Sequence, residues 1–232
     1  MKLVKNLNLP INYLFRSFGT YGYLCAMQFP SKLIEDAVNA FATLPGIGKK
    51  TALRLVMHLL QKEANDTKNL SEAILKMRTE IKFCKTCHNV SDEDICSICS
   101  NSYRDKSVVC IVENFRDIIA IENTRHYNGL YHVLEGLISP MDGIGPEQLN
   151  IQTLVQRMES GEVKEIIMAL NPTIDGDTTI FYLSKMLSKY ELKITSIARG
   201  IAFGGELEYV DEITLARSIQ SRLPYENYLN KN

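Results

Sequence analysis

The chain has 232 residues, of which 45% are hydrophobic and 23% charged, and its formal net charge is −1. This length allows one large domain or two to three small ones with a real core. The sequence lacks any apolar run of about 18 residues, so we expect no membrane span. Residues 1–106 hold 15 Lys and Arg against 10 Asp and Glu, whereas residues 107–232 hold 11 against 17. This asymmetry predicts that the basic N-terminal half faces a polyanion and that the acidic C-terminal half binds a metal or a protein partner. The alternative is that the charges vary over the surface without functional meaning.

The first 26 residues differ from the rest of the chain. Polar, charged and proline residues interrupt their apolar pattern, and neither a secretory signal nor a cleavage site is recognisable. A second methionine, Met27, directly precedes the first helical pattern. We therefore expect residues 1–26 to be a poorly ordered or mis-started extension. The cysteine pattern and the lack of a secretory signal together predict the reducing cytoplasm as the location of the protein.

An all-helical module is expected over residues 27–83. The first helix follows Pro30 and carries its apolar residues at helical spacing. The turn LPGIG at 44–48 then leads into a second amphipathic helix, KKTALRLVMHLLQK. A third expected helix, LSEAILKMRTEIKF, covers residues 70–83.

The turn between the first two helices has the composition of a nucleic-acid contact. Gly46 and Gly48 let the backbone approach a phosphate, whose charge the N-terminus of the next helix favours. Lys49 and Lys50 flank that point, and Arg54 lies one helical turn later on the same face as Lys50. Such contacts predict salt-sensitive DNA binding without sequence specificity. A purely structural helical hairpin is the alternative.

Four of the six cysteines form two C-x-x-C pairs within the expected zinc finger at residues 84–106. Each C-x-x-C turn can direct two thiolates at one point, and two such turns complete a tetrahedral zinc site. A closed set of four ligands predicts one structural Zn²⁺ that stabilises a segment too short for a core. Two disulfides are the alternative, and His88 is a competing ligand that four thiolates make unnecessary. The expected ligands are Cys84, Cys87, Cys96 and Cys99.

Short apolar strands alternate with helical stretches from residue 107 onward. The expected strands are VVCIVE, LYHVLEG, EIIMAL and LKITSIA, and the expected helices are FRDIIAIENTR, IQTLVQRMES and TTIFYLSKMLSKY. This alternation predicts an α/β domain with a mainly parallel sheet over residues 107–200. A C-terminal segment, residues 201–232, contains a last helix that stops at Pro224. The whole chain is therefore expected to be an α+β protein of several modules.

Three carboxylates in this region could hold a divalent cation. Glu113 ends one expected strand, while Asp175 and Asp177 follow another across a single glycine. Because the carboxyl ends of strands build the sites of α/β sheets, these side chains could meet around Mg²⁺. Solvated turn aspartates are the alternative. The sequence offers neither a phosphate-binding loop nor an evident second catalytic group beside them.

Several motifs together resemble the RecR family of bacterial recombination mediators. They are LPGIGKKTALRL, the four-cysteine segment, HYNGLYHVLEGLISPMDGIGPEQLN, ALNPTIDGDTT and ARGIAFGGELEYVDEITL, in family order over residues 27–225. The resemblance implies a helix-hairpin-helix, a four-cysteine zinc finger and a Toprim domain with a C-terminal segment. It also implies a non-enzymatic role in DNA repair: oligomers, such as dimers or tetrameric rings, clamp double- and single-stranded DNA. With RecO, and in some species RecF, family members help to load RecA on single strands.

The resemblance also assigns residues. It implies zinc at the four cysteines, DNA contacts at Lys50 and Arg54, and the Toprim acidic positions at Glu113, Asp175 and Asp177. Two departures are visible: Asp-Gly-Asp stands where relatives commonly have Glu-Gly-Glu, and Glu135 stands where a glycine is expected. The sequence thus favours a DNA-binding scaffold without catalysis. A Mg²⁺-dependent Toprim enzyme, such as a nuclease or primase-like transferase, is the alternative.

Overall fold

The computed structural model describes residues 29–222 and 224. The expected extension at 1–26 and the tail beyond Pro224 lie outside these residues. The chain divides into two compact units, Met1–Ala73 and Ile74–Asn232, which are treated separately below. In the described part of the chain, no helix is both long and apolar enough to cross a membrane.

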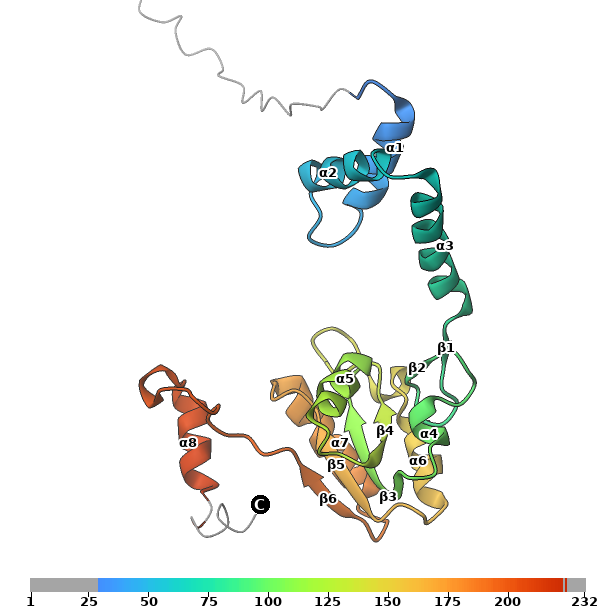
Figure 1. Cartoon of the computed structure of the whole chain (residues 1–232). Coiled ribbons are helices and arrows are strands. Elements are labelled where there is room, and N and C mark those ends of the chain that lie inside the picture. Colours follow the sequence, from blue (N-terminus) through green and yellow to red (C-terminus); the bar gives the residue numbers. More distant parts are fainter. Residues whose placement is uncertain (1–28, 223, 225–232) are drawn as a thin grey trace, which may run out of the picture. The chain divides into compact units, whose positions relative to one another are not determined.

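The first unit is helical, as expected. Helices α1 (Lys32–Ala42) and α2 (Lys49–Leu60) pack through a small core (Figure 1). Its fully buried members are Val38, Ala52 and Val56.

Helix α3 differs from the expected helix at 70–83, because it begins at Ala64 and ends at Glu80. None of its residues is buried, so apolar spacing could not reveal its start. It ends where Lys82–Phe83 (β1) pairs in antiparallel fashion with Val90–Ser91 (β2).

The second unit contains a four-stranded parallel sheet. Its order is β4-β3-β5-β6, so the two central strands are β3 and β5. The strands are β3 (Asp105–Val112), β4 (Gly129–Val133), β5 (Glu165–Ala169) and β6 (Lys193–Ser196). They alternate with helices α5 (Phe115–Thr124), α6 (Ile151–Glu159) and α7 (Ile174–Leu187). This confirms the expected α/β domain with a parallel sheet.

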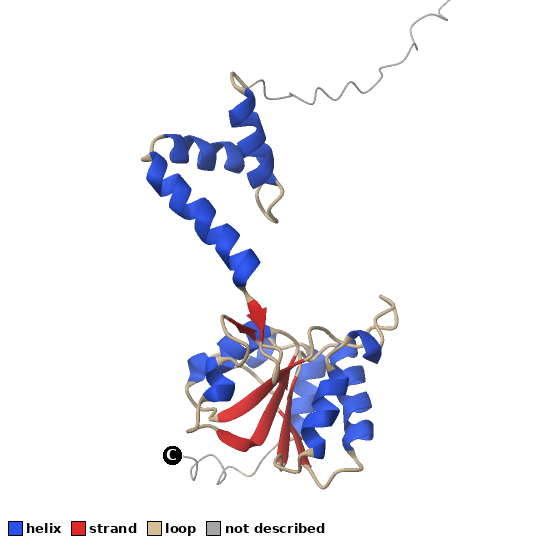
Figure 2. Ribbon diagram, turned by 90° about the vertical axis from the view of Figure 1, so that its right-hand side faces the viewer, coloured by secondary structure: helices blue, strands red, loops and turns tan. Residues whose placement is uncertain are grey.

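Helices cover both faces of this sheet (Figure 2). Val109 and Ile111 of β3 belong to the core that includes α6 and α7, whereas Cys110 and Val112 belong to the core that includes Ile118 of α5. The chain leaves β3 towards one edge through α5 and later leaves β5 towards the other edge through α7. Right-handed crossovers in opposite directions place these helices on opposite faces. A crevice is therefore expected at the carboxyl ends of β3 and β5.

The remaining elements are short. Helix α4 (Ser97–Ser100) follows the second cysteine pair, and 3₁₀ turns occupy Pro146–Gln148 and Leu207–Tyr209. The C-terminal segment ends in α8 (Glu212–Gln220), so the expected last helix ends a few residues before Pro224. Glu135 has a φ of 63°, a conformation that favours glycine, which explains why a glycine is expected there.

Candidate functional site

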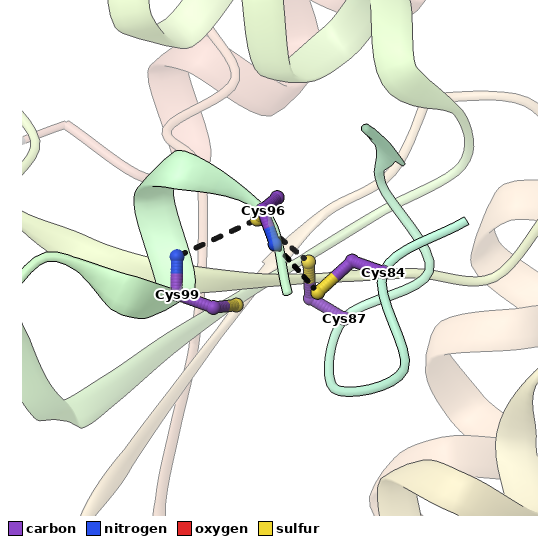
Figure 3. A group of neighbouring side chains, drawn as sticks. All are labelled: Cys84, Cys87, Cys96 and Cys99. Atoms are coloured by element: carbon purple, nitrogen blue, oxygen red, sulfur yellow. Dashed lines mark hydrogen bonds between the residues drawn. The ribbon is translucent and has the colours of Figure 1, made fainter. Parts of the chain in front are cut away.

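The four cysteines converge on one point. Cys84 and Cys87 come from the loop after β1, and Cys96 and Cys99 come from the start of α4 (Figure 3). All four sulfur atoms lie within 4.8 Å of one another, and the Sγ atoms of Cys87 and Cys96 are 3.6 Å apart. Tetrahedral zinc with Zn–S bonds of about 2.3 Å needs sulfur separations of about 3.8 Å. The donor set therefore fits Zn²⁺.

Two of the sulfurs accept hydrogen bonds from backbone N–H groups. The Cys96 N–H donates to Cys84 Sγ at 3.3 Å, and the Cys99 N–H donates to Cys96 Sγ at 3.4 Å. The hydrogen bond between the Cys87 and Cys96 side chains is the main reason why the pKa of Cys96 lies below the usual value for a thiol. The same bond, together with burial, raises the pKa of Cys87. A bound dication favours the thiolate form of all four, which metal ligation requires.

The zinc segment is tied to the sheet by its backbone and by His88. The Val133 N–H of β4 donates to the Cys87 carbonyl at 2.8 Å. His88 lies outside the sulfur cluster, and its Nε2 is 2.8 Å from the Thr153 hydroxyl on α6. Its ring packs edge-on against His132, with centroids 5.3 Å apart. Burial lowers the pKa of His132 to about 3, so this neighbour is neutral at pH 7. His88 therefore joins the finger to the α/β domain.

The hairpin turn has the backbone geometry that its glycines suggest. The Ile47 N–H donates to the Leu44 carbonyl at 3.1 Å, and Gly46 has a φ of 78°. Proline followed by a left-handed glycine is typical of a type II turn. Gly48 is the N-cap of α2, and a Cβ added at either glycine would meet no atom within 4 Å. The turn and the first N–H groups of α2 are thus open to a ligand.

The expected basic contacts all lie at this open end of α2. Lys49, Lys50 and Arg54 are exposed, and the ion pairs found among the described residues do not involve them. Their charges are therefore available to an anion at the helix N-terminus. Their role in DNA binding stays a prediction.

The acidic residues lie at the expected edge of the sheet but do not converge. Glu113 directly follows β3, and its carboxylate accepts a hydrogen bond of 2.8 Å from the Asn171 amide beyond β5. Asp175 and Asp177 lie in the first turn of α7, which begins four residues earlier than the expected TTIFYLSKMLSKY. The two aspartates therefore lie at a helix N-terminus, where carboxylates are favourable, and not on a turn between the strand and the helix.

Local contacts explain why α7 begins here. The Thr173 hydroxyl caps the helix by accepting from the Gly176 N–H at 3.0 Å. A Cβ on Gly176 would lie 1.9 Å from the Asn171 carbonyl oxygen, so only glycine allows this close approach. The glycine between the aspartates is therefore required by packing.

Asp177 is bound by two arginines that the sequence interpretation missed. Arg199 Nη2 lies 2.5 Å from its Oδ1, and Arg217 Nη2 of α8 lies 3.7 Å from its Oδ2. The bond from Arg199 is the main cause that lowers the pKa of this carboxyl below its usual value. Among the described residues, the cysteines form the one group of ligand atoms close enough for a metal ion. As arranged, the three carboxylates do not fit one Mg²⁺, and that role stays a prediction.

Comparisons with known proteins agree with this architecture. Family models match four consecutive stretches: the RecR helix-hairpin-helix at 34–78, the RecR zinc finger domain with four cysteines at 81–101, the Toprim domain at 107–198 and the RecR C-terminal region at 200–222. Recombination protein RecR of Cytophaga hutchinsonii is 58% identical over 201 residues, which cover 86% of this chain and 98% of the relative. The chain belongs to the RecR family.

Other members of the RecR family are similarly close. The protein of Flavobacterium johnsoniae is 56% identical over 206 residues, covering 89% of this chain and all of the relative. That of Bacteroides thetaiotaomicron is 54% identical over 195 residues, covering 84% and 95%. Together with the converging sulfurs, the match to the RecR zinc finger model confirms the expected structural zinc site and excludes the disulfide alternative. The sulfur cluster is therefore a structural zinc site.

Proposed function

We propose that this protein is a non-enzymatic DNA-binding recombination mediator. Membership of a family whose relatives are named recombination proteins supports the recombination role. In this proposal the helix-hairpin-helix binds the backbone of double- and single-stranded DNA, the zinc finger holds its segment on the sheet, and the protein acts as a clamp-like homo-oligomer. It works with RecO, and with RecF where that protein is present, to help load RecA.

The observation that best supports DNA binding is the exposed basic end of α2, whose cations form no ion pair with the residues that the structure describes. Lys50 and Arg54 lie one turn apart beside the open glycine turn. Phosphates that approach this end meet free N–H groups, a helix dipole and two cations. Base edges would not be read, so the expected binding is independent of sequence.

The test is the salt dependence of DNA binding. Each phosphate contact contributes about 0.9 to the logarithmic salt slope on duplex DNA, so Lys50→Ala with Arg54→Ala should reduce the slope by nearly 2. A matched control is Lys62→Ala with Lys68→Ala, because both lysines are exposed and lie beyond the other end of α2. Fluorescence anisotropy with a labelled duplex measures both slopes. If the hairpin variant keeps the slope of the control, the hairpin is not the DNA interface.

Two further measurements test the absence of catalysis and the clamp. Because both Asp177 oxygens contact arginine, we expect pure protein neither to cleave nor to join labelled DNA in Mg²⁺. Turnover that disappears in Asp175→Asn would instead support the Toprim enzyme. Light scattering with and without DNA tests the oligomer, and a monomer under both conditions would contradict a clamp.

A further inference from the structure

A basic pocket lies between the chain that follows β6 and the last turn of α8. Its volume is about 850 Å³, and the residues that line it in the described chain include arginines and serines but neither aspartate nor glutamate. The polar side chains are Arg199, Arg217, Arg222, Ser196, Ser218, Gln220 and Ser221. The pocket belongs entirely to the second unit, and its lining shares no residue with the zinc site or the hairpin.

A single carboxylate from outside the pocket engages two of its arginines. Asp177 contacts both Arg199 and Arg217, through different oxygens. Two guanidinium groups paired with one carboxylate leave a net charge of +1. Arg222 adds a further positive charge, because among the described residues its side chain donates only to the neutral Ile219 carbonyl. The arginine side chains are 28% and 48% exposed at positions 199 and 217, so a solute can reach them.

The chemistry of this pocket matches a phosphate group. A guanidinium presents a planar fork of N–H donors that fits two phosphate oxygens, and serine hydroxyls can supply further donors. A phosphate diester carries the same single charge as the Asp177 carboxylate and offers more acceptor directions. Asp177 therefore engages guanidinium groups that a phosphate in the pocket would also use.

Exposed aromatic side chains nearby in the sequence indicate which phosphate is bound. Phe203 and Tyr209 lie on the stretch between the two arginines and are largely exposed. Proteins that bind single strands combine backbone-binding cations with aromatic rings on which bases stack. The same stretch also carries the acidic residues Glu206, Glu208, Asp211 and Glu212. None of them lines the pocket, and the Asp211 carboxylate caps α8 by accepting the Thr214 N–H at 2.9 Å.

We propose that this pocket binds a backbone phosphate of single-stranded nucleic acid, in competition with Asp177. The inference rests on the proposed DNA-binding function and adds a second contact to it, distinct from the hairpin. It also gives Asp177 a role that does not require Mg²⁺.

The experiment uses the zinc-loaded full chain and a fluorescent oligo-dT 15-mer. Arg199→Gln with Arg217→Gln should weaken binding about tenfold, as expected for lost charge-assisted hydrogen bonds, and should lower the salt slope by about 0.7. Asp177→Asn should tighten binding about two- to fivefold, the range set by exposed ion pairs. The control is Lys185→Gln with Lys189→Gln, which removes the same charge from exposed positions outside the pocket.

The two proposals fail in different ways. If the arginine variant binds the oligonucleotide like its lysine control, the pocket proposal is overturned, whatever the hairpin variant does. If Lys50→Ala with Arg54→Ala alone has no effect, only the hairpin is excluded. Should the arginine variant misfold, weaker binding by Asp177→Asn still contradicts competition. Inorganic phosphate separates the sources: if it raises the melting temperature and the oligonucleotide does not, the site binds free phosphate and the nucleic-acid assignment is wrong.

Discussion

The hydroxyl of Thr179 ties the first turns of α7 to the chain that follows β4. This side chain is fully buried, accepts the Ile138 N–H at 2.9 Å and donates to the Asp175 carbonyl at 2.7 Å. Thr179→Val keeps the shape and removes both bonds. The Ile138 N–H then stays buried without its partner, which costs about 1–3 kcal/mol of unfolding free energy. The same change should loosen the chain on which Asp175 and Asp177 stand.

Thr178 provides a matched control on the same turn of helix. Its hydroxyl donates to the Ile174 carbonyl at 2.8 Å but accepts no bond from a buried N–H in the described structure. Thr178→Val should therefore change stability by no more than about 0.5 kcal/mol.

Urea unfolding followed by circular dichroism measures both variants. With a slope of about 1–3 kcal/mol/M, the midpoint for Thr179→Val should fall by roughly 1 M relative to the control. Hydrogen exchange at Ile138 gives a local readout and should accelerate in this variant alone. If the two variants unfold at the same midpoint and protect Ile138 equally, the hydroxyl does not hold this corner.

Two further predictions concern the zinc site and Asp177. Cys84→Ser should release zinc and lower the melting temperature. The control, Cys110→Ser, changes a buried thiol outside the cluster and should retain one zinc per chain. Colorimetric metal analysis measures the zinc, and equal zinc contents in both variants would contradict the assigned ligands. Arg199 lowers the folded-state pKa of Asp177, so the carboxylate stabilises the fold above its unfolded pKa of about 3.9, and this contribution is lost as pH falls through the folded value. Asp177→Asn should therefore melt below wild type at pH 7 and converge with it once the pH falls below the folded-state pKa of Asp177, and a gap that widened on acidification would refute the ion pair.

Local features were predictable from the sequence where neighbouring residues complete them. The zinc ligands lie within sixteen residues of chain, and two C-x-x-C turns need little else to meet. The hairpin turn is similar, because a proline and a left-handed glycine suffice for its shape. The apolar runs of the four strands were also recognisable, since a parallel sheet buries both faces of its central strands.

The acidic corner could not be predicted in this way. The sequence shows neither the cap at Thr173 nor the arginines that contact Asp177, which come from positions 22 and 40 residues after it. The first residues of the helix at 64–80 were missed because positions 64–69, ANDTKN, contain no large apolar side chain to mark a helical face.

The sequence alone therefore determined the modules, their order and the zinc ligands, because those depend on local spacing and on burial patterns. Only the tertiary structure decided the partners of each charge. It tied Glu113 to Asn171 and Asp177 to Arg199 and Arg217. Electrostatic pairing depends on distances between segments that are remote in the chain, and the packing of α7, β6 and α8 sets those distances.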